Sequence, residues 1–107
     1  MAATYKVLGQ SAPLATTATT LYTCPGQTVI STLFVCNRGN SITTFRISVD
    51  VDGAGDDNKD YLYYDVEIAA NDTLATTTGI TLNKDDLIRV YAGNANLSFS
   101  AFGAEIA

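Results

Sequence analysis

The densest group of side chains that could bind a ligand is an acidic stretch in the middle of the chain. It consists of Asp50, Asp52, Asp56, Asp57, Asn58 and Asp60. Carboxylate oxygens are the ligands that calcium prefers, and Asp50-Val51-Asp52-Gly53 is similar to the start of an EF-hand loop. That pattern fails further on, because Ala54 occupies the fifth position and Tyr61 the twelfth, where a bidentate Glu is needed. We therefore expect a solvated acidic loop in which Asp50, Asp52, Asp56 and Asp57 hold no structural calcium, with a calcium site of another type as the alternative.

The chain lacks the residue combinations of common catalytic sites. It has no histidine, which removes the most common general base and every triad built on it. Asp65 and Glu67 are two residues apart on a predicted strand, and nothing beside them supplies a nucleophile or a desolvated environment. The glycines of Gly53-Ala54-Gly55 are followed by acidic residues, which repel phosphate. We expect a protein that is not an enzyme and that needs no cofactor.

Composition indicates a single β-rich domain spanning residues 1–107. The chain is 47% hydrophobic and 16% charged, which is too apolar for a disordered chain and about the size of one domain. A net charge of −5 argues against nucleic acid as a partner, since such binders present a basic surface. The longest apolar run, residues 29–36, is far shorter than the ~20 residues of a membrane-spanning helix. Residues 1–10 lack the basic and apolar regions of a secretory signal, so we expect neither a signal nor a membrane span.

The two cysteines are expected to be free and buried. Pro25-Gly26 is typical of a hairpin turn, which places Cys24 beside the turn and Cys36 at the far end of the following strand. At ~3.3 Å per residue, that separation exceeds the reach of a disulfide. Two buried free thiols are consistent with synthesis in a reducing compartment.

Alternating apolar residues, separated by turn residues about every ten positions, predict eight strands and no helix. The predicted strands are residues 4–8, 20–24, 28–36, 43–51, 61–68, 73–82, 87–91 and 97–102. Residues 9–20 form a loop or an extended arm, and a break is expected at Gly79. This pattern predicts an antiparallel two-sheet β-sandwich of seven or eight strands, either jelly-roll or immunoglobulin-like, without deciding the strand order. The side chains expected to point inward are Phe45, Ile47, Val49, Leu62, Tyr64, Val66, Ile88, Val90, Leu97 and Phe99.

The strand at residues 28–36 is apolar on both predicted faces. Val29, Leu33 and Val35 share one face, while Ile30, Phe34 and Cys36 share the other. Either the second face is covered within the same subunit, or another subunit covers it. Tyrosine is enriched in protein interfaces, and Tyr61 and Tyr63 are predicted to point outward. The candidate interface residues are Leu33, Phe34, Tyr61 and Tyr63.

Seven segments carry a resemblance to a family of small virion proteins of tailed bacteriophages. They are ATTLYT (18–23), NRG (37–39), TTFR (43–46), NKDYLYYD (58–65), IAANDT (68–73), GITL (79–82) and LSFSAFGAEI (97–106). The resemblance implies a virion structural protein made in the bacterial cytoplasm, with a capsid decoration (cement) protein as the first expectation. A tail, neck or baseplate component is the alternative, and a carbohydrate- or calcium-binding β-module is a remoter one. The expected partners are further copies of the chain, as a homotrimer or else a hexameric ring, and other virion proteins such as the major capsid protein.

Overall fold

A computed structural model describes residues 2–55 and 57–106, and within these ranges the chain forms eight strands, two short 3₁₀ helices and no α-helix. The strands are β1 (Ala3–Ser11), β2 (Thr19–Thr23), β3 (Gln27–Asn37), β4 (Thr43–Asp50), β5 (Tyr61–Ile68), β6 (Thr73–Asn83), β7 (Leu87–Ala92) and β8 (Leu97–Ile106). The helices η1 (Val51–Gly53) and η2 (Asn58–Asp60) lie in the acidic loop. All eight predicted strands are present, and several are longer than predicted.

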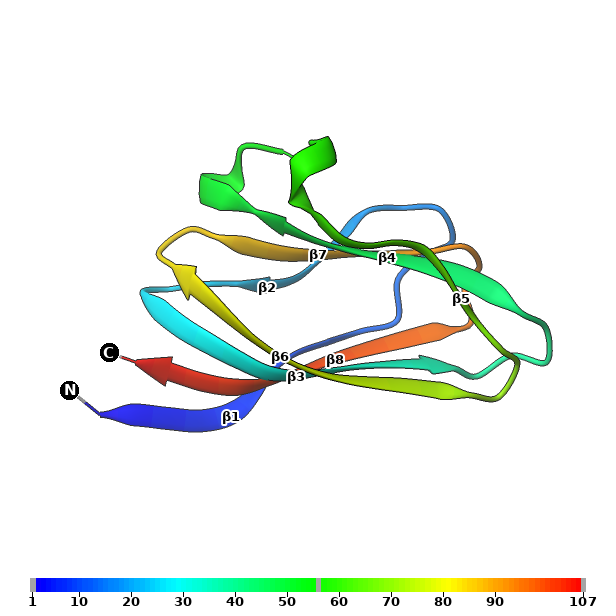
Figure 1. The fold of residues 1–107 in the computed structure, drawn as a ribbon, viewed down its shortest axis with the longest axis horizontal. Helices are drawn as coiled ribbons and strands as arrows, with labels where there is room; N and C mark the ends of the chain where they lie inside the picture. Colours follow the sequence, from blue (N-terminus) through cyan, green and yellow to red (C-terminus); the bar gives the residue numbers. More distant parts are fainter. Residues whose placement is uncertain (1, 56, 107) are drawn as a thin grey trace.

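The strands form two four-stranded antiparallel sheets packed face to face (Figure 1). The first sheet has the order β1-β8-β3-β6 and the second has the order β2-β7-β4-β5. Strand pairs β1–β8, β2–β7, β3–β6 and β4–β5 follow one rule, in which the first strand of the chain pairs with the last and so on inward. The chain is therefore one long hairpin rolled into a sandwich, which is the jelly-roll arrangement rather than the immunoglobulin one.

The hydrophobic core lies between the two sheets. Phe45 is fully buried at its centre, with its ring 6.2 Å from that of Phe99 and 5.9 Å from that of Tyr63. Eight of the ten side chains predicted to point inward are in this core or pack against it: Phe45, Ile47, Val49, Val66, Ile88, Val90, Leu97 and Phe99. The other two, Leu62 and Tyr64, are exposed, so the prediction was wrong for them.

A β-bulge in β5 explains this error. Phe45 pairs with Val66 and Ile47 pairs with Tyr63, so β5 uses one more residue than β4 between the two pairs. Asp65 lies in the bulge with φ of 52°, a left-handed conformation that Asp tolerates better than most residues. The extra residue reverses the alternation, because a strand's side chains point to opposite faces in turn. Tyr63 therefore packs against the core, although its position in the sequence predicted exposure.

A second bulge changes the two faces of β3. On β8 the partners of Ile30 and Thr32 are the adjacent residues Gly103 and Phe102, so Ser31 is the extra residue of β3. As a result Ile30 points inward together with Leu33 and Val35, and the predicted grouping of Val29 with Leu33 is wrong. Side chains Val29, Phe34 and Cys36 share the outer face. The predicted break at Gly79 is confirmed as the matching irregularity in β6, where Gly79 has φ of 66°.

Residues 12–18, between β1 and β2, cross from one sheet to the other, while residues 9–11 of the predicted loop or extended arm belong to β1 and residues 19–20 to β2. Ala15 forms a parallel bridge with Ala92, and the Thr16 N–H donates to the Ala92 carbonyl at 2.8 Å. Pro13, which belongs to this crossover, is buried. Both cysteines are free, but only Cys24 is buried, while Cys36 is half-buried on the outer face of β3.

Candidate functional site

Asp50 and Asp60 of the acidic loop bind backbone N–H groups of the same region. Buried Asp50 accepts from the Gly55 N–H at 2.9 Å, and its carboxylate lies 3.7 Å from the Arg89 guanidinium. Asp60 accepts from the Asp57 N–H at 2.9 Å and so caps η2.

The neighbouring Asp86 acts in the same way and accepts from the N–H groups of Asp52 and Asn83. Asp56 lies outside the described residues. Among the residues that the structure describes, no three His, Cys, Asp or Glu side chains are grouped so as to hold a metal ion. The expectation that this loop holds no structural calcium stays a prediction.

The carboxylate of Asp65 is paired with a cation on the outer face of the second sheet. Arg46 donates to Asp65 at 2.7 Å, and its guanidinium carbon lies 4.2 Å from the ring centre of Tyr64 and 4.4 Å from that of Tyr91. The hydrogen bond to Asp65 raises the pKa of Arg46 above its ordinary value. This arrangement orders an arginine between two aromatic rings, and Asp65 serves it as a partner rather than as a general base.

A polar network that sequence reasoning missed connects the two sheets at the open end of the sandwich. Tyr22 of β2 donates from its hydroxyl to Glu105 of β8 at 2.6 Å, and Lys6 of β1 donates to the same carboxylate at 3.1 Å. The Tyr22 oxygen is 2.7 Å from the Thr28 hydroxyl, which in turn is 3.2 Å from the Cys24 sulfur. Because the single Tyr22 hydrogen goes to Glu105, Thr28 donates to Tyr22 and the Cys24 thiol donates to Thr28.

This network shifts the acid–base properties of both central groups. The hydrogen bonds from Tyr22 and then Lys6 lower the pKa of Glu105 below its ordinary value. Burial, followed by the hydrogen bond to Glu105, raises the pKa of Tyr22 above its ordinary value. Glu105 is therefore ionised and Tyr22 neutral at neutral pH, which is the protonation state that this set of donors and acceptors requires.

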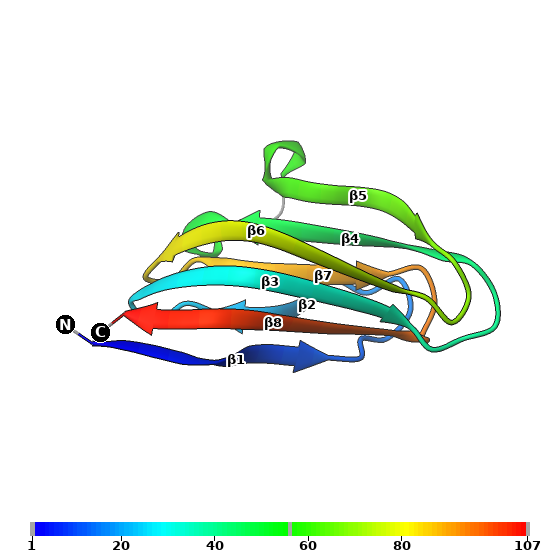
Figure 2. The same ribbon diagram turned by 60° about the horizontal axis from the view of Figure 1, so that its bottom comes forward.

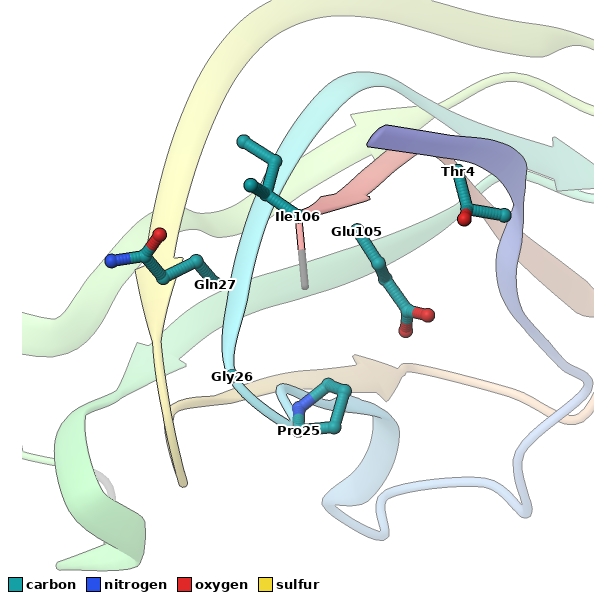
Figure 3. A pocket seen from close by; sticks show the side chains of 6 residues that line it. All are labelled: Thr4, Pro25, Gly26, Gln27, Glu105 and Ile106. Carbon is teal, nitrogen blue, oxygen red and sulfur yellow. The ribbon is translucent and has the colours of Figure 1, made fainter. Parts of the chain in front are cut away.

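A pocket of ≈ 260 Å³ adjoins the network and is lined by Thr4, Pro25, Gly26, Gln27, Glu105 and Ile106. In Figure 3 the Glu105 carboxylate points toward the space between Thr4 and Pro25, whereas the Gln27 side chain points away. Both Glu105 oxygens already accept hydrogen bonds from Tyr22 and Lys6. The carboxylate therefore ties the sheets together and offers little to a ligand in this pocket.

The four predicted interface residues do not form one patch. Leu33 is 1% exposed inside the core, so its side chain cannot contact a partner. Tyr63 packs against the core and its hydroxyl is 2.8 Å from that of Thr76. Tyr61 is half-buried, with its ring edge-on to Tyr64 at 4.9 Å on the second sheet. Phe34 is 38% exposed on the opposite side of the sandwich, where its ring contacts Phe102 at 5.6 Å.

The largest candidate for an interaction surface is the outer face of the first sheet, which we call the neutral face. Strand register and burial place nineteen side chains on it: Ala3, Tyr5, Val7, Gln10, Gln27, Val29, Thr32, Phe34, Cys36, Thr73, Ala75, Thr77, Thr81, Asn83, Ser98, Ser100, Phe102, Ala104 and Ile106. None of these side chains is charged. Figure 2 shows the four strands that carry it, running side by side along the length of the molecule.

The neutral face has a shallow groove and a ridge. The groove, of ≈ 330 Å³, is lined by Ala3, Tyr5, Val29, Ser31, Gly103, Ala104 and Ile106. The ridge consists of Phe34, Phe102 and Val7, because Phe102 contacts Phe34 and pairs with Val7 across β1 and β8. At one end, the Arg38 guanidinium donates to Ser98 at 2.7 Å and marks a charged rim.

A signal for this face is present in the sequence, although the bulges hide it from an analysis of alternation. The four strands of the first sheet contain only two charged residues, Lys6 and Glu105, and these pair with each other at the margin of the inner side. By contrast, the strands of the second sheet, which are shorter in total, carry five charged residues: Arg46, Asp50, Asp65, Glu67 and Arg89. Charge therefore marks β4 and β5 as strands of a different surface, although β2 has no charged residue and β7 has only Arg89.

Comparison with protein-family models, with curated proteins and with solved structures finds no match for this chain. Within the described residues, no helix is long and apolar enough to cross a membrane. Any functional proposal therefore rests on the surfaces and contacts above.

Proposed function

We propose that this protein is a structural component of a tailed-phage virion, acting as a capsid decoration protein that binds the outside of the shell and stabilises its subunits. The observation that carries the proposal is the neutral face, which lacks charge on a chain whose net charge is −5. The cores of protein interfaces are depleted in charged residues, and the neutral face shares this property. Such a face is suited to burial against a protein neighbour.

The chemistry of the described polar groups supports a structural role. Glu105 joins the two sheets through Tyr22 and joins β8 to β1 through Lys6, while Asp50, Asp60 and Asp86 bind backbone N–H groups. These groups contribute to the fold instead of converging on a reacting molecule. The jelly-roll arrangement is common in viral capsid proteins, which supports the proposal by analogy of fold alone.

The proposal is tested by measuring the copy number of the protein in purified virions, relative to the major capsid protein on a stained gel. A copy number comparable to that of the major capsid protein supports decoration of the shell. A much smaller copy number, such as one ring of subunits would contain, supports a tail, neck or baseplate location instead. Absence from the particle refutes both the shell location and this one. Rebinding of purified protein to particles that lack it, followed by a gain in their heat resistance, tests the stabilising role directly.

A further inference from the structure

We propose that the neutral face is covered by a second copy of the same chain, packed face to face across a twofold axis. This inference concerns self-association and stands on the geometry alone, whether or not the protein belongs to a virion.

Electrostatic repulsion between two copies of the chain is weaker at the neutral face than at the other faces of the molecule. Two copies carry −5 each and repel one another wherever their acidic groups approach. The second sheet presents Asp65 and Glu67, and the acidic loop adds Asp52 and Asp57, all of them exposed. The neutral face is where two identical chains can meet without placing like charges opposite each other.

The shape of the neutral face is self-complementary. Along β8 the ridge residue Phe102 lies two positions from Ala104 in the groove, which is roughly 7 Å along the strand. A twofold axis that lies in the interface and crosses the strands between these positions exchanges ridge and groove. The Phe34 and Phe102 rings of each copy then face the groove of the other, and the small side chains of Ala3 and Ala104 leave room for them.

The area is sufficient for a specific interface. The four strands of the first sheet are 9, 10, 11 and 11 residues long. At ~3.3 Å per residue and ~4.8 Å between strands, the face measures about 600 Å² per copy and about 1,200 Å² for a pair. This exceeds the ~1,000 Å² that a specific interface needs. An isologous pair results, whereas a cyclic trimer or sixfold ring needs two different complementary surfaces.

The test compares two matched substitutions by sedimentation equilibrium and light scattering. Val7→Glu places a carboxylate on the ridge, and Leu62→Glu places one on the outer face of the second sheet. Val7 is 47% exposed on edge strand β1, and Leu62 is 48% exposed on edge strand β5, so the two changes have similar costs for folding. We expect the wild type to weigh twice the 11.3 kDa of the chain. Val7→Glu should raise the dimer dissociation constant at least about 100-fold, equivalent to about 2.8 kcal/mol, and Leu62→Glu less than about threefold.

Circular dichroism and melting curves check that both variants fold. Should Val7→Glu fail to fold, Tyr5→Glu replaces it, because Tyr5 is 84% exposed at the groove. A wild type that stays monomeric at millimolar concentration overturns the inference, as does a dimer that Leu62→Glu disrupts and Val7→Glu does not. A trimer overturns the twofold packing, because three copies cannot all be paired face to face. A monomeric variant that still binds particles would show that self-association and particle binding use different surfaces, so the virion role would no longer draw support from the neutral face.

Discussion

Replacing Tyr22 with Phe should destabilise the fold by about 2–3 kcal/mol, because the change removes one hydroxyl without altering the packed ring. That hydroxyl donates to the Glu105 carboxylate at 2.6 Å and accepts from Thr28 at 2.7 Å. A hydrogen bond to a charged group contributes about 1.5–3 kcal/mol and one between neutral groups about 0.5–1.5 kcal/mol. Glu105 keeps its second donor, Lys6, so the loss should fall short of the sum of the upper values.

The assay is urea unfolding followed by circular dichroism at neutral pH. Tyr22→Phe should lower the urea midpoint with an unchanged slope, since the surface exposed on unfolding is the same. Tyr64→Phe is the matched control, because Tyr64 is exposed and uses its ring rather than a buried hydroxyl against Arg46. We expect this control to stay within about 0.5 kcal/mol of the wild type.

A double-mutant cycle with Glu105→Gln tests the physical cause. If the charge-assisted bond provides most of the effect, Tyr22→Phe should cost clearly less in the Glu105→Gln background than in the wild type. Equal losses in the two backgrounds would refute the reasoning, as would a loss below about 0.5 kcal/mol for Tyr22→Phe alone.

Three further predictions address the core, the acid response and the acidic loop. Phe45→Ala should cost about 3–5 kcal/mol in urea unfolding, and a loss below about 1 kcal/mol would mean that the central ring is not packed as described. The lowered pKa of Glu105 means that its ionised form stabilises the fold above its unfolded value of 4.5, and that this stability is lost as pH falls through the lower folded value. The stability difference between wild type and Glu105→Gln should therefore be level at neutral pH and shrink on acidification below pH 4.5, and a difference that stays constant to lower pH would contradict this. Millimolar calcium should leave the melting temperature unchanged, whereas a rise that Asp52→Ala abolishes would show a site in the acidic loop.

Alternation of apolar residues was enough to locate all eight strands, because most segments keep a strict period of two between turn residues. It failed on the faces of β3 and β5. In β3 the extra residue Ser31, and in β5 the extra residue Asp65, move the neighbouring side chains to the other side, and β5 has a second register shift between Tyr63 and Tyr61. Such a shift depends on the partner strand, and nothing in the local alternation reveals it.

The strand order and the polar network could not be predicted from the sequence for a related reason. Tyr22, Glu105 and Lys6 are separated by much of the chain, and they meet only because β1 pairs with β8 and the sheets then stack. The neutral face could be predicted in part, since the sequence itself shows that the strands of the first sheet contain almost no charged residues. The interface residues were predicted on β5 and β3, the two strands whose inward and outward sides were partly wrong. Of these residues, only Phe34 lies on the neutral face.

The rolled-hairpin arrangement has a consequence for the order in which the chain folds. Contacts between β4 and β5 close a short loop, whereas the pairing of Ala3 with Ile106 joins opposite ends of the described chain (Figure 1). Closing longer loops costs more entropy, and folds dominated by distant contacts form slowly. We expect folding to begin at the β4–β5 hairpin and to proceed outward through β3–β6 and β2–β7. Since β8 lies between β1 and β3, the first sheet lacks a central strand until β8, which follows the other seven strands in the sequence, has been synthesised. Its apolar strands then stay unpaired longest, which makes the nascent chain most prone to aggregate through the same segments that later form the neutral face.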